Sequence, residues 1–141
     1  MKPCTLFLLT LLFASPALAA TDSIESTVQA LNLTQVEIHP DHEGPDAHGR
    51  LPNGGWIKLD FHHDGVLEEI ETDHGALVPV SEIEQVLPGH VLGAERFPRD
   101  AMFEKIEFDH GKIEFEGRDA QGRRFKAEWN ASGRLEEWKI D

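Results

Sequence analysis

Sulfur chemistry is nearly absent from this sequence of 141 residues, which contains one cysteine, Cys4, and two methionines. A single cysteine forms no disulfide within the chain, and Cys4 lies in an N-terminal segment with the features of a signal peptide. We therefore expect the mature protein to have no disulfide, no thiolate nucleophile and no cysteine metal ligand. Its stability must then come from packing.

Basic residues are also scarce. Thirteen lysines and arginines stand against 26 aspartates and glutamates, which gives a formal net charge of −13. Because phosphate binding needs a basic surface, this composition argues against nucleic acid and anionic membranes as partners. It suits cations or basic peptides, and solubility alone accounts for it equally well.

Long apolar runs are confined to the first 20 residues. Lys2 precedes an apolar stretch from Leu6 to Ala14, and Ala17-Leu18-Ala19 has the small-x-small pattern of a cleavage site. The stretch is too short to span a bilayer and no later one is longer, so membrane insertion is not expected. Residues 1–19 are predicted to be a signal peptide, and the mature protein is predicted to be periplasmic or secreted.

Two short helices are predicted, from Thr21 to Leu33 and from Ser81 to Leu87, and Pro88-Gly89 is expected to end the second. Elsewhere apolar residues alternate with polar ones, which predicts antiparallel strands joined by glycine-containing turns. The alternate positions of the last strands are charged, which predicts a solvated outer face of the sheet: Glu107, Glu114, Lys126 and Glu128.

An internal repeat appears when the chain is shifted by 68 residues. Leu67-Glu68-Glu69 falls on Leu135-Glu136-Glu137, Gly65 falls on Gly133, and the apolar positions of the preceding strands also align. A shared break in the alternation predicts a bulge at the same place in each hairpin. The pattern favours an internal duplication over a chance match of two hairpins.

The predicted fold class is therefore α+β, with two repeats of a short helix followed by an antiparallel β-meander. The first repeat is assigned to residues 20–75 and the second to residues 76–141. A Pro/Gly-rich segment from Pro40 to Gly55 is expected to be an irregular loop in the first repeat. Whether the two halves share one sheet stays open.

The chain resembles the PepSY domains of bacterial envelope proteins. The resemblance rests on the export signal, the repeated half, and the closing pattern Phe125-Lys126-Ala127-Glu128-Trp129, Gly133-Arg134-Leu135 and Trp138-Lys139-Ile140. It covers most of residues 80–141 and, more weakly, 21–72, and implies two degenerate tandem copies with PepSY- or cystatin-like halves. The family is named after propeptides of thermolysin-like metallopeptidases. The resemblance thus implies a small module that binds or inhibits a protease or another envelope protein, and it supplies no catalytic residues.

Histidines and carboxylates are concentrated in the predicted loop. Imidazole and carboxylate together suit Zn²⁺, Cu²⁺ or Ni²⁺. The segment does not match the helical zinc-protease motif, because Asp46 stands where that motif has its second histidine and Pro45 disfavours a helix. The two interpretations are a solvated acidic loop and a metal site with these candidate ligands: His39, Asp41, His42, Asp46 and His48.

Hydrolytic machinery is missing from the sequence. Its serines lie at predicted caps, helices or turns without a nucleophile-elbow pattern, and Gly54-Gly55 precedes a strand instead of following one as a phosphate loop does. We therefore predict a non-enzymatic module that binds a protein or a basic peptide. The alternative prediction is a periplasmic protein that binds a divalent metal through residues 39–48.

The metal alternative predicts a calorimetric result. Titration of the mature protein with Zn²⁺, Cu²⁺ or Ni²⁺ should give stoichiometric binding at about micromolar affinity or tighter, lost in a His42→Ala/His48→Ala variant that still folds. Heats no larger than weak surface association would leave the histidine-rich segment as solvated surface.

Overall fold

The computed structural model describes residues 16–141, with side chains from Ser23 onward. The predicted signal peptide up to residue 15, with Cys4, lies outside the described residues. In residues 16–141, nine strands form one sheet in which every pairing is antiparallel. The strand order is β1-β2-β3-β4-β6-β7-β8-β9, and the short β5 pairs with β6.

The first half of the sheet follows one helix. Helix α1 spans Pro16–Ala30, and the strands are β1 (Thr34–His39), β2 (Asp46–Arg50), β3 (Trp56–Phe61) and β4 (Leu67–Thr72). The second half comprises β6 (Met102–Asp109), β7 (Lys112–Arg118), β8 (Arg124–Trp129) and β9 (Leu135–Ile140). Between them lie β5 (Val78–Pro79), helix α2 (Gly89–Leu92) and three single 3₁₀ turns: η1 (Asp73–Gly75), η2 (Val80–Glu82) and η3 (Glu84–Val86).

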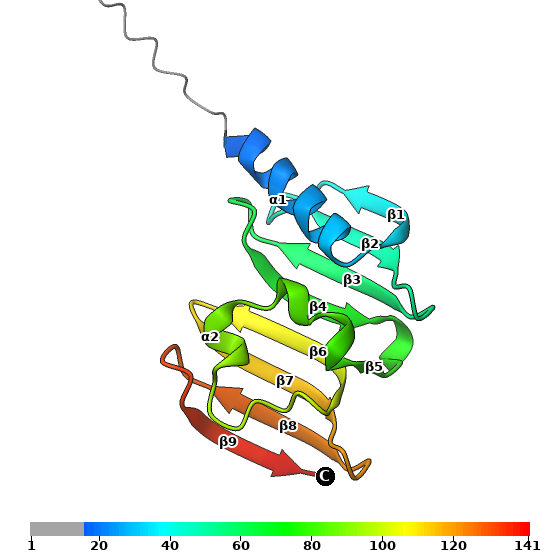
Figure 1. Ribbon diagram of the computed structural model, residues 1–141. Helices are drawn as coiled ribbons and strands as arrows, with labels where there is room; N and C mark the ends of the chain where they lie inside the picture. Colours follow the sequence, from blue (N-terminus) through cyan, green and yellow to red (C-terminus); the bar gives the residue numbers. More distant parts are fainter. Residues whose placement is uncertain (1–15) are drawn as a thin grey trace, which may run out of the picture.

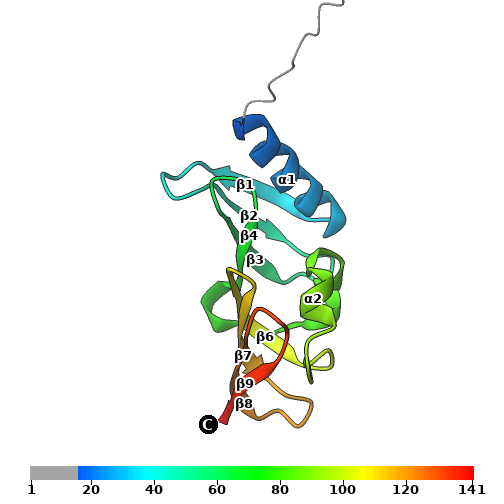
Figure 2. The same cartoon turned by 90° about the vertical axis from the view of Figure 1, so that its left-hand side faces the viewer.

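The helices cover only one face of the sheet. Both α1 and α2 lie on the same side of the sheet, and the edge-on view shows only the single turn η1 toward the opposite side, where its Asp73 contacts His48 (Figures 1 and 2). Because neighbouring strand residues point to opposite faces, one set of alternate residues is buried under the helices and the other is solvated. We call the uncovered side the open face.

The core lies between the sheet and the helical segments. Ile24 of α1 and Leu31, the residue just after this helix, are buried in the core. The aromatic side chains of the second half stack in the same layer: Phe115 on Phe125, with ring centroids 5.1 Å apart, and Phe125 on Trp138 at 4.5 Å. Because these apolar side chains occupy every second position of the strands, the positions between them must face solvent.

The predicted fold class is wrong in its arrangement. The chain does not form two helix-plus-meander repeats, because β4 pairs directly with β6 and the eight long strands make one continuous sheet. Only α1 exceeds four residues among the α-helices described, and the predicted helix from Ser81 to Leu87 is two 3₁₀ turns. Pro88-Gly89 begins the short α2 instead of ending a helix, since proline is tolerated just before a first helical turn.

The segment from Pro40 to Gly55 is also more regular than predicted. It contains β2, which pairs with both β1 and β3. The strand β2 has only five residues, and its two buried positions are Ala47 and Gly49. Because these are small residues of low β-propensity, neither propensity nor apolar periodicity indicates this strand. The strand β1 before it was missed for a similar reason, since most of its side chains are exposed.

The two hairpins matched by the 68-residue shift have the same bulge. The register of β3 and β4 shifts between Asp60 and Phe61, and that of β8 and β9 shifts between Glu128 and Trp129. The bulge predicted from the break in alternation is therefore present in both. The duplication itself stays a prediction.

Two glycines that are 68 residues apart give a matched test of packing. A Cβ on Gly117 would lie 2.1 Å from the backbone oxygen of Met102, whereas a Cβ on Gly49 would approach only side-chain carbons, at 3.2 Å or more. We expect Gly117→Ala to destabilise the protein by about 3 kcal/mol, because the backbone must move. We expect Gly49→Ala to change the stability by less than about 1 kcal/mol. Equal changes in the urea midpoint for the two variants would contradict this.

Candidate functional site

A row of carboxylates crosses the open face. In each of seven neighbouring strands one acidic residue lies directly opposite the acidic residue of the next strand. Like charges placed directly opposite one another destabilise a sheet, so packing does not favour this arrangement. We call this set the carboxylate row: Asp46, Asp60, Glu69, Glu107, Glu114, Glu128 and Glu137.

Four lysines in the adjacent cross-strand row offset part of this repulsion. Lys58 Nζ lies 2.9 Å from Asp60 and 3.9 Å from Asp46. Lys105 Nζ bridges Glu69 and Glu107 at 3.3 Å each. Four ammonium groups thus serve seven carboxylates, and an excess of negative charge remains on the face.

The other two lysines serve the second half of the row. Lys126 Nζ lies 2.7 Å from Glu114, and Lys139 Nζ lies 2.8 Å from Glu137. Glu128, between them, takes part in none of the ion pairs found among the described residues. The hydrogen bond to Glu114 raises the pKa of the Lys126 ammonium, and the one to Glu137 raises the pKa of Lys139.

Glu69 is the member of the row that burial affects most clearly. Its side chain is 21% exposed. Burial raises the pKa of the Glu69 carboxyl, and the nearby Lys105 opposes this only in part. Burial lowers the pKa of Lys105, but its pairing with Glu69 and Glu107 outweighs burial and raises it. The ion pair between Glu69 and Lys105 therefore requires partial desolvation of the Glu69 carboxylate, which opposes its stabilising effect.

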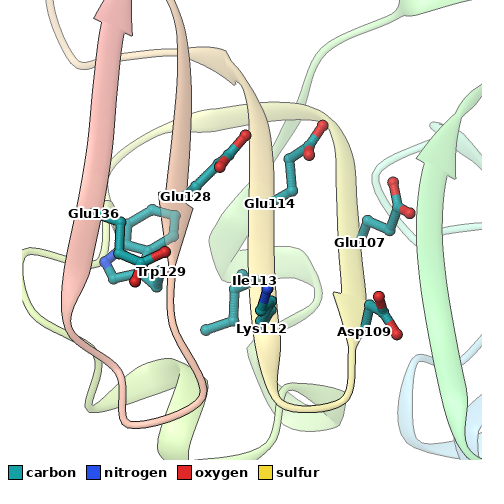
Figure 3. A pocket seen from close by; sticks show the side chains of 8 residues that line it. All are labelled: Glu107, Asp109, Lys112, Ile113, Glu114, Glu128, Trp129 and Glu136. Carbon is teal, nitrogen blue, oxygen red and sulfur yellow. The ribbon is translucent and has the colours of Figure 1, made fainter.

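Two acidic hollows lie along the carboxylate row. One, of about 280 Å³, is lined by acidic residues of β3, β4 and β6, and by Phe108. The other, of about 150 Å³, lies over β6 to β9, where Glu107, Glu114 and Glu128 stand side by side on three neighbouring strands (Figure 3). Lys112 at its rim is the one basic residue that lines it. Both hollows offer carboxylates to a cation and little apolar surface to a small molecule.

The five candidate metal ligands do not converge. His39 Nδ1 lies 2.9 Å from Asp46 Oδ1, whereas His48 Nε2 lies 3.0 Å from the carboxylate of Asp73. Asp41 accepts the backbone N–H of His42 in the turn between β1 and β2. Among the described residues, no group of three or more histidine, cysteine, aspartate or glutamate side chains is arranged to hold a metal ion. Metal binding at residues 39–48 stays a prediction.

Sequence reasoning missed several groupings. It identified the acidic residues of the last strands but not that Asp60, Glu69 and Glu137 continue the same row, because cross-strand registers are not visible in one sequence. It also did not pair His48 with Asp73. The imidazole ring of His48 stacks on the indole of Trp56 in β3, with ring centroids 5.2 Å apart. A cleft of about 310 Å³ near α2 brings together His62, His90 and His110, which are far apart in the chain.

No protein-family model matches the sequence, and no curated protein matches it. Several solved structures resemble the chain, among them the following three. A protein of unknown function from Bacteroides vulgatus, described as periplasmic, is 16% identical, with 84% of this chain and 90% of that chain covered and a TM-score of 0.49. A protein from Bacteroides thetaiotaomicron, described as calcium-regulated and periplasmic, is 19% identical, with coverages of 89% and 94% and a TM-score of 0.47.

The third structure is a second Bacteroides vulgatus protein, described as a periplasmic member of the DUF2874 family. It is 19% identical, with coverages of 86% and 87% and a TM-score of 0.47. At these identities and TM-scores the likeness transfers neither a family nor a ligand to this chain. The PepSY resemblance therefore stays a prediction. Within residues 16–141, none of the helices has both the length and the apolar character that a membrane crossing requires.

The burial of Glu69 predicts a pH-dependent effect on stability. Because its pKa is higher in the folded than in the unfolded protein, protonated Glu69 favours the fold, and this contribution is lost as the pH rises through the folded-state pKa. We expect Glu69→Gln to melt at a higher temperature than the parent at pH 7, and the difference to vanish below about pH 4.

The matched control for this prediction is Glu107→Gln. It removes the other partner of Lys105 from a more exposed position, 43% against 21%, so we expect a smaller gain at pH 7. A fall in the melting temperature of Glu69→Gln at pH 7 would mean that its ion pair outweighs its burial.

Proposed function

We propose that the protein is a non-enzymatic periplasmic module that binds a basic polypeptide on its open face. The carboxylate row is the observation that carries this proposal. Seven acids that lie opposite one another in neighbouring strands lower the stability of the sheet. A cationic partner bound over them would relieve this repulsion and gain complementary contacts. The signal-peptide pattern supports the location, and the descriptions of the three similar structures agree with it.

The dimensions of the row favour a polypeptide over a small cation. Seven strands at a spacing of about 4.8 Å give a row of about 29 Å. A helix of about 20 residues has the same length, and one turn of it advances by about 5.4 Å, close to the strand spacing. A basic helix or arm can therefore place successive lysines or arginines over successive carboxylates. The PepSY resemblance supports a protease or another envelope protein as the source of such a segment.

The metal-binding alternative has less support. His39 and His48 are each already paired with a carboxylate, and Asp41 is engaged by the backbone of the same turn. A divalent ion would have to displace these contacts and draw ligands together from two strands and a turn. The calorimetric titration described above tests it separately.

The open-face proposal predicts a position-dependent effect of charge. Binding of a 20-residue lysine–alanine helical peptide, followed by fluorescence anisotropy, should weaken at least about tenfold in Glu107→Lys/Glu128→Lys, because both residues flank Glu114 in the row. The double variant should keep the parent's circular dichroism spectrum.

The matched control is Glu25→Lys/Asp100→Lys, which changes the net charge by the same amount at exposed positions away from the open face. It should lower the affinity by no more than about threefold, through long-range charge alone. Equal losses in the two double variants would show that only net charge matters, and would overturn the assignment of the face.

A further inference from the structure

The two edges of the sheet are not equivalent. At the β1 edge the register is interrupted between Thr34 and Glu37, Gln35 has a positive φ of 53°, and Pro40, which has no N–H, follows the strand. Bulges and prolines of this kind prevent another strand from pairing with an edge. The β9 edge has an unbroken register from Glu137 to Ile140.

Main-chain groups of β9 face outward at defined residues. Asp141 donates its N–H to the carbonyl of Arg124, so Asp141 belongs to a hydrogen-bonded pair with β8. Because bonded and non-bonded pairs alternate in an antiparallel ladder, Lys139 and Glu137 also bond β8, and Trp138 and Ile140 direct their N–H and C=O groups away from the sheet. At the start of the strand, the carboxylate of Glu95 accepts the N–H of Leu135. The free edge thus begins after Leu135.

We propose that β9 pairs with β9 of a second copy of this chain, antiparallel and with the two-fold axis at Trp138. A two-fold axis centred on a residue brings outward-facing residues together, and near the middle of the free edge it can lie at Glu137, Trp138 or Lys139. An axis at Glu137 places that glutamate opposite its own copy, and an axis at Lys139 does the same for the lysine. Only the axis at Trp138 places Glu137 opposite Lys139 of the second copy, twice.

The charges of Glu137 and Lys139 therefore favour one register of pairing and do not prevent a second strand from pairing with β9. Glu137 and Lys139 point to the open face, where they already form an ion pair of 2.8 Å within one chain. In the proposed dimer they form a cluster of two glutamates and two lysines across the axis, in non-hydrogen-bonded pairs, whose side chains approach most closely. Each copy thus supplies both signs of charge to the other.

The covered face of the sheet supports the same axis. Trp138 of the edge strand β9 stacks on Phe125, which stacks on Phe115. Arg96 lies over the same indole, with its guanidinium carbon 5.6 Å from the ring centroid. Pairing at Trp138 sets the two indoles opposite each other, so the apolar surface of each indole and its arginine lies beside that of the second copy. Ile140, which is 44% exposed, then becomes covered by the neighbouring strand.

Sedimentation of the mature protein across a range of concentrations tests the proposal. We expect a monomer–dimer equilibrium in the parent. Glu137→Lys and Lys139→Glu should each weaken dimerisation at least about tenfold, because each places like charges opposite one another. The exchanged variant Glu137→Lys/Lys139→Glu should regain the parent's dimerisation, which also shows that loss in the single variants is not unfolding.

Hydrogen exchange gives a second readout. The amides of Trp138 and Ile140 should become protected as the concentration rises, whereas that of Lys139, already bonded to β8, should not change. A monomer at all concentrations, or an exchanged variant that fails to regain dimerisation while folded, would overturn the proposal. The peptide-binding test uses Glu107 and Glu128, which lie on β6 and β8, so its failure and that of the dimer are separate results.

Discussion

Burial of a single face of the sheet is the constraint on which the rest of the molecule depends. One layer of apolar side chains packs under α1, α2 and the turns η2 and η3, which cover the same side of the sheet (Figure 2). Every second residue of the strands must then face water, and that surface is free to carry charge. One cross-strand row of this surface consists of acids, and in the next row lysines alternate with Glu71 and Glu116. The electrostatics of the open face therefore follow from the register of the core.

The balance on that face is between two opposing terms. Repulsion between opposite carboxylates destabilises the sheet, and lysines such as Lys105, shared between two acids, offset part of it. Exposed ion pairs contribute little individually, so the lysines do not cancel the row. An ordered array of uncompensated charge on a surface is typical of recognition, and it is the basis of our proposal of a cationic partner.

Much of the strand content was predictable, because apolar alternation and glycine-containing turns are local signals. The hairpins β3-β4 and β8-β9, their shared bulge, and the buried face of α1 all follow from such patterns. The turn residues His74 and His110, each in an Asp-His-Gly sequence, have the left-handed conformation typical of such turns. The prediction of two separate repeats was wrong because it depended on a non-local contact. The pairing of β4 with β6 joins the two halves into one sheet, and no periodic pattern in either strand indicates it.

The candidate site shows the same division. The charged alternate positions Glu107, Glu114 and Glu128 were visible in the sequence, but their alignment with Asp60 and Glu69 depends on registers set by turns and bulges. The histidine-rich segment was conspicuous by composition, yet β1 and β2 separate His39 from His48 and give each its own carboxylate. Local composition therefore drew attention to the histidine-rich segment, whose histidines are separated in the fold, and gave no indication of the full carboxylate row.

The order of strands in the sheet has a consequence for how the chain assembles. Apart from the short β5, each strand lies beside the strand that precedes it in the sequence, so every ladder closes across a hairpin or one connecting segment. Most of these contacts close across short loops, so little loop-closure entropy opposes them. Because synthesis proceeds from the N-terminus, each new strand finds its neighbour already made. The sheet can thus grow by addition at one end, without waiting for the C-terminus and without exposing a strand that lacks a place to pair.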